Sequence, residues 1–481
     1  MSPAKDDDVI RILPAEDSTP STTPTAPVSP IASKSRSKPR PAPRLVSLDA
    51  FRGFIMLMLA AHGFGILALS NTPADRPLWS IIDRETTQRV AFHFNHPPWQ
   101  SSFVPGTHDA TIGSQWLHVG VSFWDLIQPA FMFMVGVSLP LSISRRETIG
   151  QSKWKRGVHA FIRSVVLVLM GVFLYSLNSS ATNWIFPNVL AQIGLGYFFV
   201  YLLTGQKIWI QTTAFLVILV GTWATVHFTP PPTDYVPEKV AASRERGEVY
   251  APPYRQWSKN GNAFSTFDRW FLNLFPRAES EGPFEFNRGG YQTLNFVPSM
   301  ATMLLGVFCG QILLSQTEAR RKVLWLILLA VILWGLGVIT GATCCPIVKR
   351  IWTPSWVLFS GGYVVGMLAI FALLFDVLPL KALAFPFVVI GANSLLVYFL
   401  GELLTGWLAE NVRRHFGGIM EATLGWIANT FHLLKNLDVP ASEAGAVMMS
   451  EFAPVVNAVS AVVMIWLFCY WLYRQKIFLR I

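Results

Sequence analysis

The feature that most restricts the fold of this chain is a succession of apolar runs, each about as long as a bilayer is thick. A helix needs about 20 apolar residues to cross the hydrocarbon core of a membrane. Ten such runs occur, at residues 51–70, 124–144, 158–177, 186–203, 208–228, 291–314, 323–340, 355–375, 384–404 and 452–473. Residues 418–434 are amphipathic and weakly apolar, and we expect them on or re-entering the outer face, or as an eleventh span. The sequence predicts an all-α polytopic membrane protein with about ten to eleven transmembrane helices.

The charge balance agrees with a membrane protein and argues against nucleic-acid binding. Only 14% of the 481 residues are charged, against about a quarter in soluble domains, and 52% are hydrophobic. The net charge is +10, but the basic residues cluster beside apolar runs. Alternate loops are basic, at 145–156, 206–207, 320–322, 381 and 474–480. Because cytoplasmic loops carry the excess of Lys and Arg, we expect both termini on the cytoplasmic side.

The chain divides into a tail and a transmembrane domain. Residues 1–44 are rich in Pro, Ser and Thr and contain no apolar run, so they are predicted to be a disordered cytoplasmic tail. Residues 45–481 form the membrane domain, with outer loops at 71–123, 229–290 and 405–451. The four cysteines lack the spacing of a metal or redox motif, and no metal is expected.

The first outer loop holds the candidate chemistry. Its segment VAFHFNHPPW, residues 90–99, offers two imidazoles, an amide and a large aromatic ring. Histidine is the side chain best suited to proton transfer near neutral pH. Asp125 opens the second span, where it could cap the helix or orient an imidazole. His62, Gln192 and Glu402 also lie at membrane depth, but packing, interhelical hydrogen bonding and contact with water explain them as well.

Five segments, in order along the chain, are similar to the heparan-α-glucosaminide N-acetyltransferase family, including its bacterial members. They are RLVSLDAFRG at 44–53, FWDLIQPAFMFMVGV at 123–137, NVLAQIGLGY at 188–197, WTPSWVLFS at 352–360 and GANSLLVY at 391–398. The resemblance implies a transmembrane acetyltransferase that takes acetyl-CoA from the cytoplasm and acetylates an amino sugar or glycan on the far side. It also implies a possible homodimer.

The resemblance directs attention to particular catalytic residues. The family carries its catalytic histidine in a His-x-x-Trp-x-Gly motif shortly before the Asp of the second span, and His96 and Trp99 match its first part. Residues 100–119 are inserted before Gly120 resumes the motif. His118, which is closer to Asp125, is therefore the rival of His96, and His93 and His108 are weaker rivals. Trp99 and Asn95 are candidates for binding the acceptor.

The cytoplasmic rim is the expected site for CoA, because Arg forks suit phosphate groups. We expect the residues that contact CoA to be polar or charged and to lie near the inner ends of the spans. They are Asp49, Arg52, Arg145, Arg146, Asn393 and Ser394. A helix cap paired with its neighbouring charge is an equally good interpretation of Asp49 and Arg52.

Two other functions fit the same scaffold. A transporter or flippase for a glycan or lipid precursor would also use polar residues and glycines within broken helices, but it would not need a catalytic histidine. An acyltransferase that moves a different acyl group would need one. A bacterial inner membrane is the expected location, or a lysosomal membrane if the source is eukaryotic.

Overall fold

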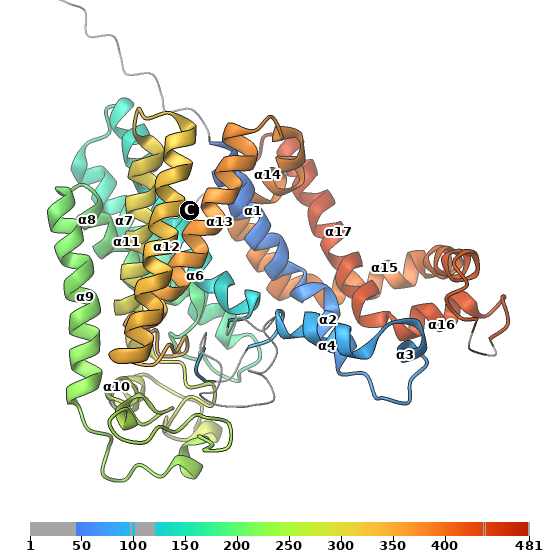
Figure 1. The fold of residues 1–481 in the computed structure, drawn as a ribbon, viewed down its shortest axis with the longest axis horizontal. Coiled ribbons are helices and arrows are strands. Elements are labelled where there is room, and N and C mark those ends of the chain that lie inside the picture. The colour runs from blue at the N-terminus through green and yellow to red at the C-terminus, as the bar shows by residue number, and fades with distance from the viewer. Residues whose placement is uncertain (1–44, 97–98, 102–120, 436, 438, 480–481) are drawn as a thin grey trace, which may run out of the picture. The chain divides into compact units, whose positions relative to one another are not determined.

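The computed structural model describes residues 45–96, 99–101, 121–435, 437 and 439–479. The predicted tail at 1–44 lies outside these residues, and so do His108 and His118. Every regular element in this part of the chain is helical (Figure 1), which confirms the all-α prediction.

The elements that build the membrane domain are helices of 15 to 37 residues. They are α1 (Val46–Ala60), α6 (Phe123–Thr148), α7 (Lys153–Ser176), α8 (Val189–Thr204), α9 (Ile208–Phe228), α11 (Phe296–Leu314), α12 (Ala319–Thr343), α13 (Pro354–Ala372), α15 (Ser394–Thr430) and α17 (Ala453–Arg474). Shorter helices connect them, namely α2 (Ile66–Ser70), α3 (Leu78–Ile81), α4 (Arg84–Phe92), α10 (Ala263–Phe271), α14 (Phe385–Gly391) and α16 (Ala444–Glu451).

Eight helices in the described ranges are long and apolar enough to cross a membrane, and the bent pair formed by α1 and residues 62–70 makes a ninth. The fourth predicted span, 186–203, corresponds to α8, which is apolar but has only 16 residues. The prediction of a polytopic α-helical membrane protein is therefore confirmed, with fewer full-length spans than the ten to eleven expected.

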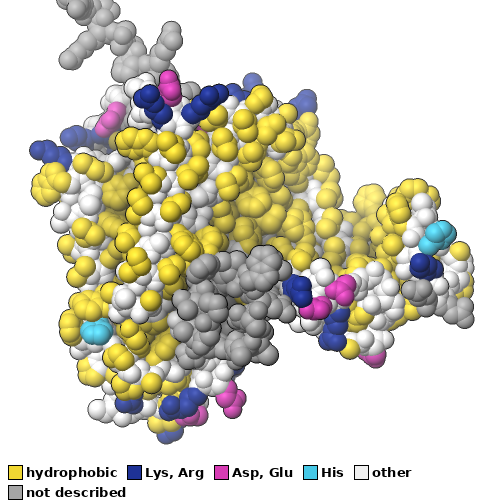
Figure 2. Space-filling view, viewed as in Figure 1, with side chains coloured by type: hydrophobic (Ala, Val, Ile, Leu, Met, Phe, Trp, Pro, Cys, Tyr) yellow, Lys and Arg dark blue, Asp and Glu magenta, His cyan; other side chains and the backbone are white. Residues whose placement is uncertain are grey.

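Burial separates inner helices from peripheral ones. The most apolar windows of α6 and α11 are each 67% buried, whereas those of α9 and α12 are 22% and 28% buried. Between Leu324 and Ile339 every exposed side chain of α12 is large and apolar, and these include Trp325, Leu328 and Val331. Figure 2 shows how much of the bundle surface is apolar. A surface of this kind is stable only against lipid, so the chain is an integral membrane protein.

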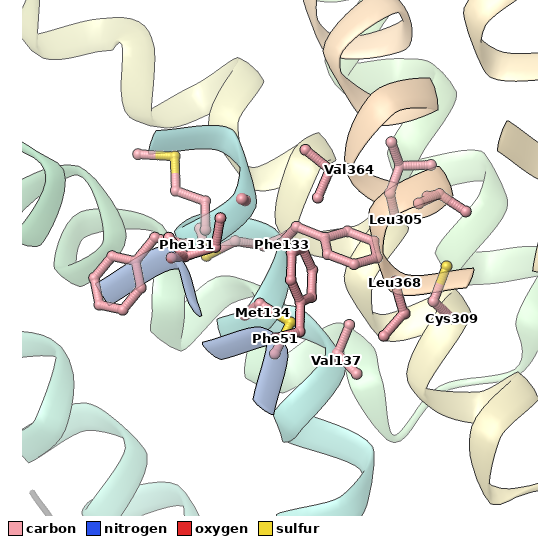
Figure 3. Packing of buried hydrophobic residues seen from close by; sticks show 14 of the residues in the cluster. Phe51, Phe131, Phe133, Met134, Val137, Leu305, Cys309, Val364 and Leu368 are labelled. Atoms are coloured by element: carbon pink, nitrogen blue, oxygen red, sulfur yellow. The ribbon is translucent and has the colours of Figure 1, made fainter. Parts of the chain in front are cut away.

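The central core joins α1, α6, α11 and α13. Figure 3 shows Phe51, Phe133, Leu305 and Leu368 from these four helices converging on one another. The backbones of α6 and α11 come very close, because a Cβ atom added at Gly136 would lie 1.9 Å from the Met303 carbonyl oxygen. Small residues permit this approach, which is how membrane helices gain packing energy without a hydrophobic driving force.

The first predicted span, 51–70, is not one continuous helix. It breaks after α1, where His62, Gly63, Phe64 and Gly65 all have positive φ angles of 43°, 62°, 55° and 71°. The two parts are bent by 42°. Glycine adopts this left-handed backbone at little cost, but His62 and Phe64 do so with strain. Hydropathy alone does not detect such a turn, because all the residues except His62 are apolar or small.

The ninth predicted span, 384–404, was wrong in its boundaries. The structure ends α14 at Gly391 and begins α15 at Ser394. Asn393 occupies the break, where its amide donates to the Ile477 carbonyl oxygen (3.1 Å) and accepts from the Leu479 amide (2.8 Å). The helix α15 then continues to Thr430, so most of residues 418–434 are its last turns rather than an eleventh span.

The bundle has two chemically different ends. One end, which we call the basic end, gathers Arg145, Arg146, Lys207, Arg320, Arg321, Lys322, Lys381 and Arg474 near helix termini, and Lys and Arg side chains line the upper edge of the view in Figure 2. The opposite end, which we call the His96 end, carries α3, α4, α10 and the loop that contains His96. Charges of both signs occur there.

Candidate functional site

The helix α4 positions the loop that carries His96 next to the start of α6. Asp83 caps α4 by accepting a hydrogen bond from the Thr86 amide at 2.7 Å. The helix ends at Phe92, and the His93 carbonyl oxygen then accepts a hydrogen bond from the Trp124 amide at 3.0 Å. This single backbone contact brings the loop from 93 to 96 against the first turn of α6.

His96 and Asp125 form a hydrogen-bonded pair. The distance from His96 Nδ1 to Asp125 Oδ1 is 2.7 Å. The carboxylate has only 6% of its side chain exposed, whereas the imidazole has 43% exposed. Because a carboxylate accepts, we assign the proton to Nδ1, which leaves the Nε2 lone pair free to take a proton from a reactant. The Asp125 backbone amide donates to Ser122 Oγ at 3.1 Å, which fixes the start of the helix.

A third residue, Lys349, contacts the His96–Asp125 pair, and the sequence analysis did not identify it. Its Nζ lies 2.9 Å from the same Asp125 Oδ1, and its side chain is 5% exposed. A buried carboxylate needs a compensating charge, and the ammonium group supplies it. The lysine comes from the segment between α12 and α13, 224 residues after Asp125. The signal available in the sequence was a pair of cations, Lys349 and Arg350, flanked on both sides by apolar residues just before the predicted eighth span.

Trp99 anchors the chain just after His96. The ring is 2% exposed, and Nε1 donates to the Trp257 carbonyl oxygen at 3.2 Å. It also lies against Gly290, where an added Cβ would be 2.5 Å from the ring. Two residues on, the Ser101 amide donates to the Ile347 carbonyl oxygen at 2.8 Å. The Trp99 ring is therefore surrounded by protein, and it holds the chain after His96 against Trp257 and Gly290.

The other candidates in the loop have different surroundings. Asn95 is exposed, and its Oδ1 accepts a hydrogen bond from the His96 amide at 2.8 Å, which shapes the turn. His93 lies edge-on to Phe92, with ring centroids 5.5 Å apart. Within the membrane bundle, Gln192 Nε2 donates to the carbonyl oxygens of Gln292 and Thr293 at 3.1 and 3.2 Å, which is the interhelical bonding expected of it.

The basic end holds the residues predicted to contact CoA. Arg52 donates to Ser138 Oγ of α6 at 2.8 Å and lies 4.0 Å from Asp49. Arg145 is exposed and follows Ser138 by two turns of α6, so the two lie on one face of the helix. The Arg146 guanidinium donates to Gln151 Oε1 at 3.2 Å and is hydrogen-bonded to His159 Nε2 at 2.7 Å.

Asn393 and Ser394 lie at the same end. A Cβ added at Gly391 would be 2.0 Å from the Asp49 carbonyl oxygen, so the break before α15 touches the first turn of α1. Asn393 is 1% exposed and uses its amide to hold the chain after α17, whereas Ser394 is partly exposed. Among the predicted basic residues, Arg145 is exposed, whereas Arg52 and Arg146 are partly buried and hydrogen-bonded to neighbouring side chains.

The two candidate regions are separated by the length of one helix. Asp125 lies in the first turn of α6 and Arg145 in its last turn. Twenty residues at 1.5 Å each give about 30 Å, which is the thickness of the hydrocarbon core. Among the described residues, no group of three or more His, Cys, Asp or Glu side chains is placed to hold a metal ion.

Comparison with known proteins gives the same family as the sequence motifs. A family model described as "Heparan-alpha-glucosaminide N-acetyltransferase, catalytic" matches residues 96–254, so the match begins at His96 and includes Asp125. Heparan-alpha-glucosaminide N-acetyltransferase of Homo sapiens is 23% identical over 445 residues, which are 82% of this chain and 59% of that protein.

The protein of the same name from Mus musculus is 24% identical over 368 residues, which are 66% of this chain and 54% of that protein. The chain thus spans little more than half the length of these relatives. The predicted resemblance to this family is confirmed at low identity.

Proposed function

We propose that this protein is a membrane acetyltransferase, which takes acetyl from acetyl-CoA at its basic end and transfers it to an amino sugar or glycan at its His96 end. The observation that carries the proposal is the 2.7 Å hydrogen bond between His96 and Asp125, at the start of the segment that matches the catalytic family model. The basic end is the cytoplasmic side in this proposal, as the distribution of Lys and Arg favours.

The chemistry follows from the free Nε2 of His96. As the acceptor amine attacks the thioester carbonyl carbon, a C–N bond forms and the C–S bond breaks. Nε2 takes the proton that the amine loses and returns it to the departing CoA sulfur. Asp125 holds the ring in the correct tautomer and stabilises the imidazolium. In a second route, Nε2 itself attacks the thioester and carries the acetyl group to the acceptor.

Acetyl-CoA fits the separation of the two regions. Its nucleotide end is anionic, and Arg52 and Arg145 offer guanidinium groups at the basic end. The pantetheine arm is long and uncharged, so it can extend between helices toward the His96 end. The other residues of the predicted set lie at neighbouring helix ends. They are Asp49 in α1, Arg146 in α6, and Asn393 and Ser394 at the start of α15.

The location and assembly complete the proposal. The apolar surface of the bundle places the protein in a bilayer, and we propose a bacterial inner membrane, or a lysosomal membrane in a eukaryotic source. A homodimer is proposed from the family resemblance. Transport of a glycan or lipid precursor is the competing function, and it would leave the His96–Asp125 pair without a chemical task.

The test is turnover of acetyl-CoA by the purified protein with glucosamine as acceptor. We expect turnover in the wild type and its loss in His96→Ala, with acetyl-CoA binding retained. His227→Ala is the matched control, since that histidine contacts Gln256 at 3.2 Å in another part of the His96 end. Loss only in His118→Ala would transfer the catalytic role to His118. Absence of acetyl-CoA binding in every variant would favour the transporter.

A further inference from the structure

The second half of α15 leaves the bundle as an arm, which we define as residues 410–451. In Figure 1 the arm extends to the right of the bundle, and its helix α16 lies below α15. The whole of α15 has 37 residues and measures about 55 Å, while a bilayer core is only about 30 Å thick. About 25 Å of this helix therefore cannot be part of a direct crossing and must lie outside the hydrocarbon core or along its surface.

One face of the arm is an apolar stripe. Val412, Phe416, Ile419, Thr423 and Trp426 follow each other at intervals of four, three, four and three residues, so they share one side of the helix. Phe416, Ile419 and Trp426 are 52%, 67% and 65% exposed. Large aromatic and branched side chains on one side of an exposed helix are typical of a contact surface.

The opposite face of the same helix is already covered. A Cβ added at Gly445 of α16 would lie 2.3 Å from the Glu421 carbonyl oxygen, so the two backbones touch. Ala428 and Met448 are buried in the small core between α15 and α16. Arg414 and Glu410 form an exposed ion pair at 2.9 Å on this polar side. The stripe therefore points away from α16.

We propose that the stripe lies in the surface of the bilayer, in the leaflet at the His96 end, so that the arm is an interfacial helix. The first half of α15 already presents Leu403 and Trp407 outward, 42% and 61% exposed, as a lipid-facing span does. In Figure 2 apolar side chains line the upper edge of the arm, the edge turned toward the basic end and thus toward the hydrocarbon core.

The charge of the arm indicates how it binds lipid. Residues 410–451 include three Lys and Arg and five Asp and Glu residues. Such a segment is not attracted to anionic headgroups, so insertion of the aromatic and branched side chains provides the attachment. The proposal therefore requires no anionic lipid.

The arm also connects the bilayer surface to the loop that carries His96. Glu451 at the end of α16 accepts from Arg76 at 2.7 Å and from the Leu78 amide at 3.2 Å. Ile81 of α3 packs into the core of the arm. The helices α3 and α4 lead directly to His93 and His96. An arm bound to the bilayer surface would thus fix the distance of the His96 loop from the membrane. This consequence does not depend on the reaction that His96 performs.

Site-directed spin labelling in nanodiscs of zwitterionic lipid tests the inference directly. The exposed Cys344 is replaced by Ser, while the buried Cys309, Cys345 and Cys469 are kept. Single labels are then placed by Phe416→Cys and Ile419→Cys on the stripe and by Arg414→Cys on the polar face. Collision rates with oxygen, which concentrates in lipid, and with a water-soluble nickel chelate are measured for each label.

The expected result is a contrast between the two faces. Labels at positions 416 and 419 should collide several-fold more with oxygen than with the nickel chelate, and the label at 414 should show the reverse. The same contrast should persist when anionic lipid is added. Equal exposure of all three labels to the nickel chelate would overturn the proposal. Protection of the stripe from both reagents, with dipolar broadening between labels, would overturn it in favour of a second copy of the chain.

Discussion

Asp125 is a buried carboxylate that faces two basic side chains, with His96 at 2.7 Å and Lys349 at 2.9 Å from the same oxygen. Burying a carboxylate without a partner costs several kcal/mol, and Lys349 offsets that cost. The remaining hydrogen bond orients the exposed imidazole. Lys349 thus compensates the charge of Asp125, and Asp125 orients the His96 ring. Only the orientation of the ring bears directly on the chemistry.

Replacement of Asp125 by Asn tests this division. The amide has the same shape but can donate to Nδ1, which would move the imidazole proton to Nε2 and remove the base. We expect kcat for acetyl transfer to fall by about 10²- to 10⁴-fold. Acetyl-CoA binding should stay within about twofold, and a thermal melt confirms that the variant is folded. An unchanged kcat would show that His96 acts without Asp125.

The sequence predicted His96 and Asp125 as site residues because both lie beside recognisable motifs. The sequence indicated that Asp125 could orient an imidazole but not which one, since His118 lies closer to Asp125 along the chain than His96 does. Lys349 was missed because it comes 224 residues later, in a segment whose charges look like those of an ordinary loop. Trp99 was expected to bind the acceptor, and only the structure shows its ring enclosed by Trp257 and Gly290.

The segment between α9 and α11 is attached to the bundle through a buried acid. Asp268 of α10 accepts a hydrogen bond from the Thr293 amide at 2.9 Å, just before α11. Burial raises the pKa of Asp268 from 3.8 to about 7. The folded protein therefore keeps this proton up to about neutral pH, while the unfolded chain releases it above about pH 4.

The expected consequence is a loss of stability as the pH rises. The contribution of Asp268 is complete below about pH 4 and is lost as the pH rises to about 7. A difference of about three pKa units corresponds to on the order of 4 kcal/mol. Asp268→Asn keeps an acceptor for the Thr293 amide and should flatten the fall in melting temperature between about pH 4 and about pH 7. An identical pH dependence in the variant and the wild type would contradict this account.

Helix boundaries were predictable where the apolar pattern matched a simple span. The predicted run 208–228 coincides with α9 (Ile208–Phe228), and 124–144 lies within α6. The predictions were wrong where backbone geometry, not hydropathy, ends a helix. Asn393 ends α14 through hydrogen bonds to the chain after α17, 84 and 86 residues away, and no local pattern encodes those contacts.

In the proposed function, the two ends of the bundle face different compartments. Cys344 offers a natural test, because it is the exposed one among the four cysteines and lies between α12 and α13 at the His96 end. A membrane-impermeant maleimide added to intact cells, or to spheroplasts if an outer membrane intervenes, should label it. Cys344→Ser should remove the signal. Labelling only after the membrane is permeabilised would invert the proposed orientation.

Arg145 and Asp125 lie at opposite ends of α6, about 30 Å apart. A soluble acetyltransferase has no need for such a separation. A membrane enzyme does, if its donor and its acceptor lie on different sides. The polytopic fold, the distribution of basic residues and the distance along α6 were predictable from the sequence. The packing of His96 against one end of α6 and of Arg52 against Ser138 was not.

The most direct test is acetyl transfer across a sealed membrane. The protein is reconstituted into vesicles and sorted by orientation, radiolabelled acetyl-CoA is supplied on the side of the basic end, and glucosamine is enclosed on the other side. We expect labelled N-acetylglucosamine in the compartment on the His96 side, and none with His96→Ala. Product formed only when both substrates are on the same side, or equal product from wild type and His96→Ala, would contradict it.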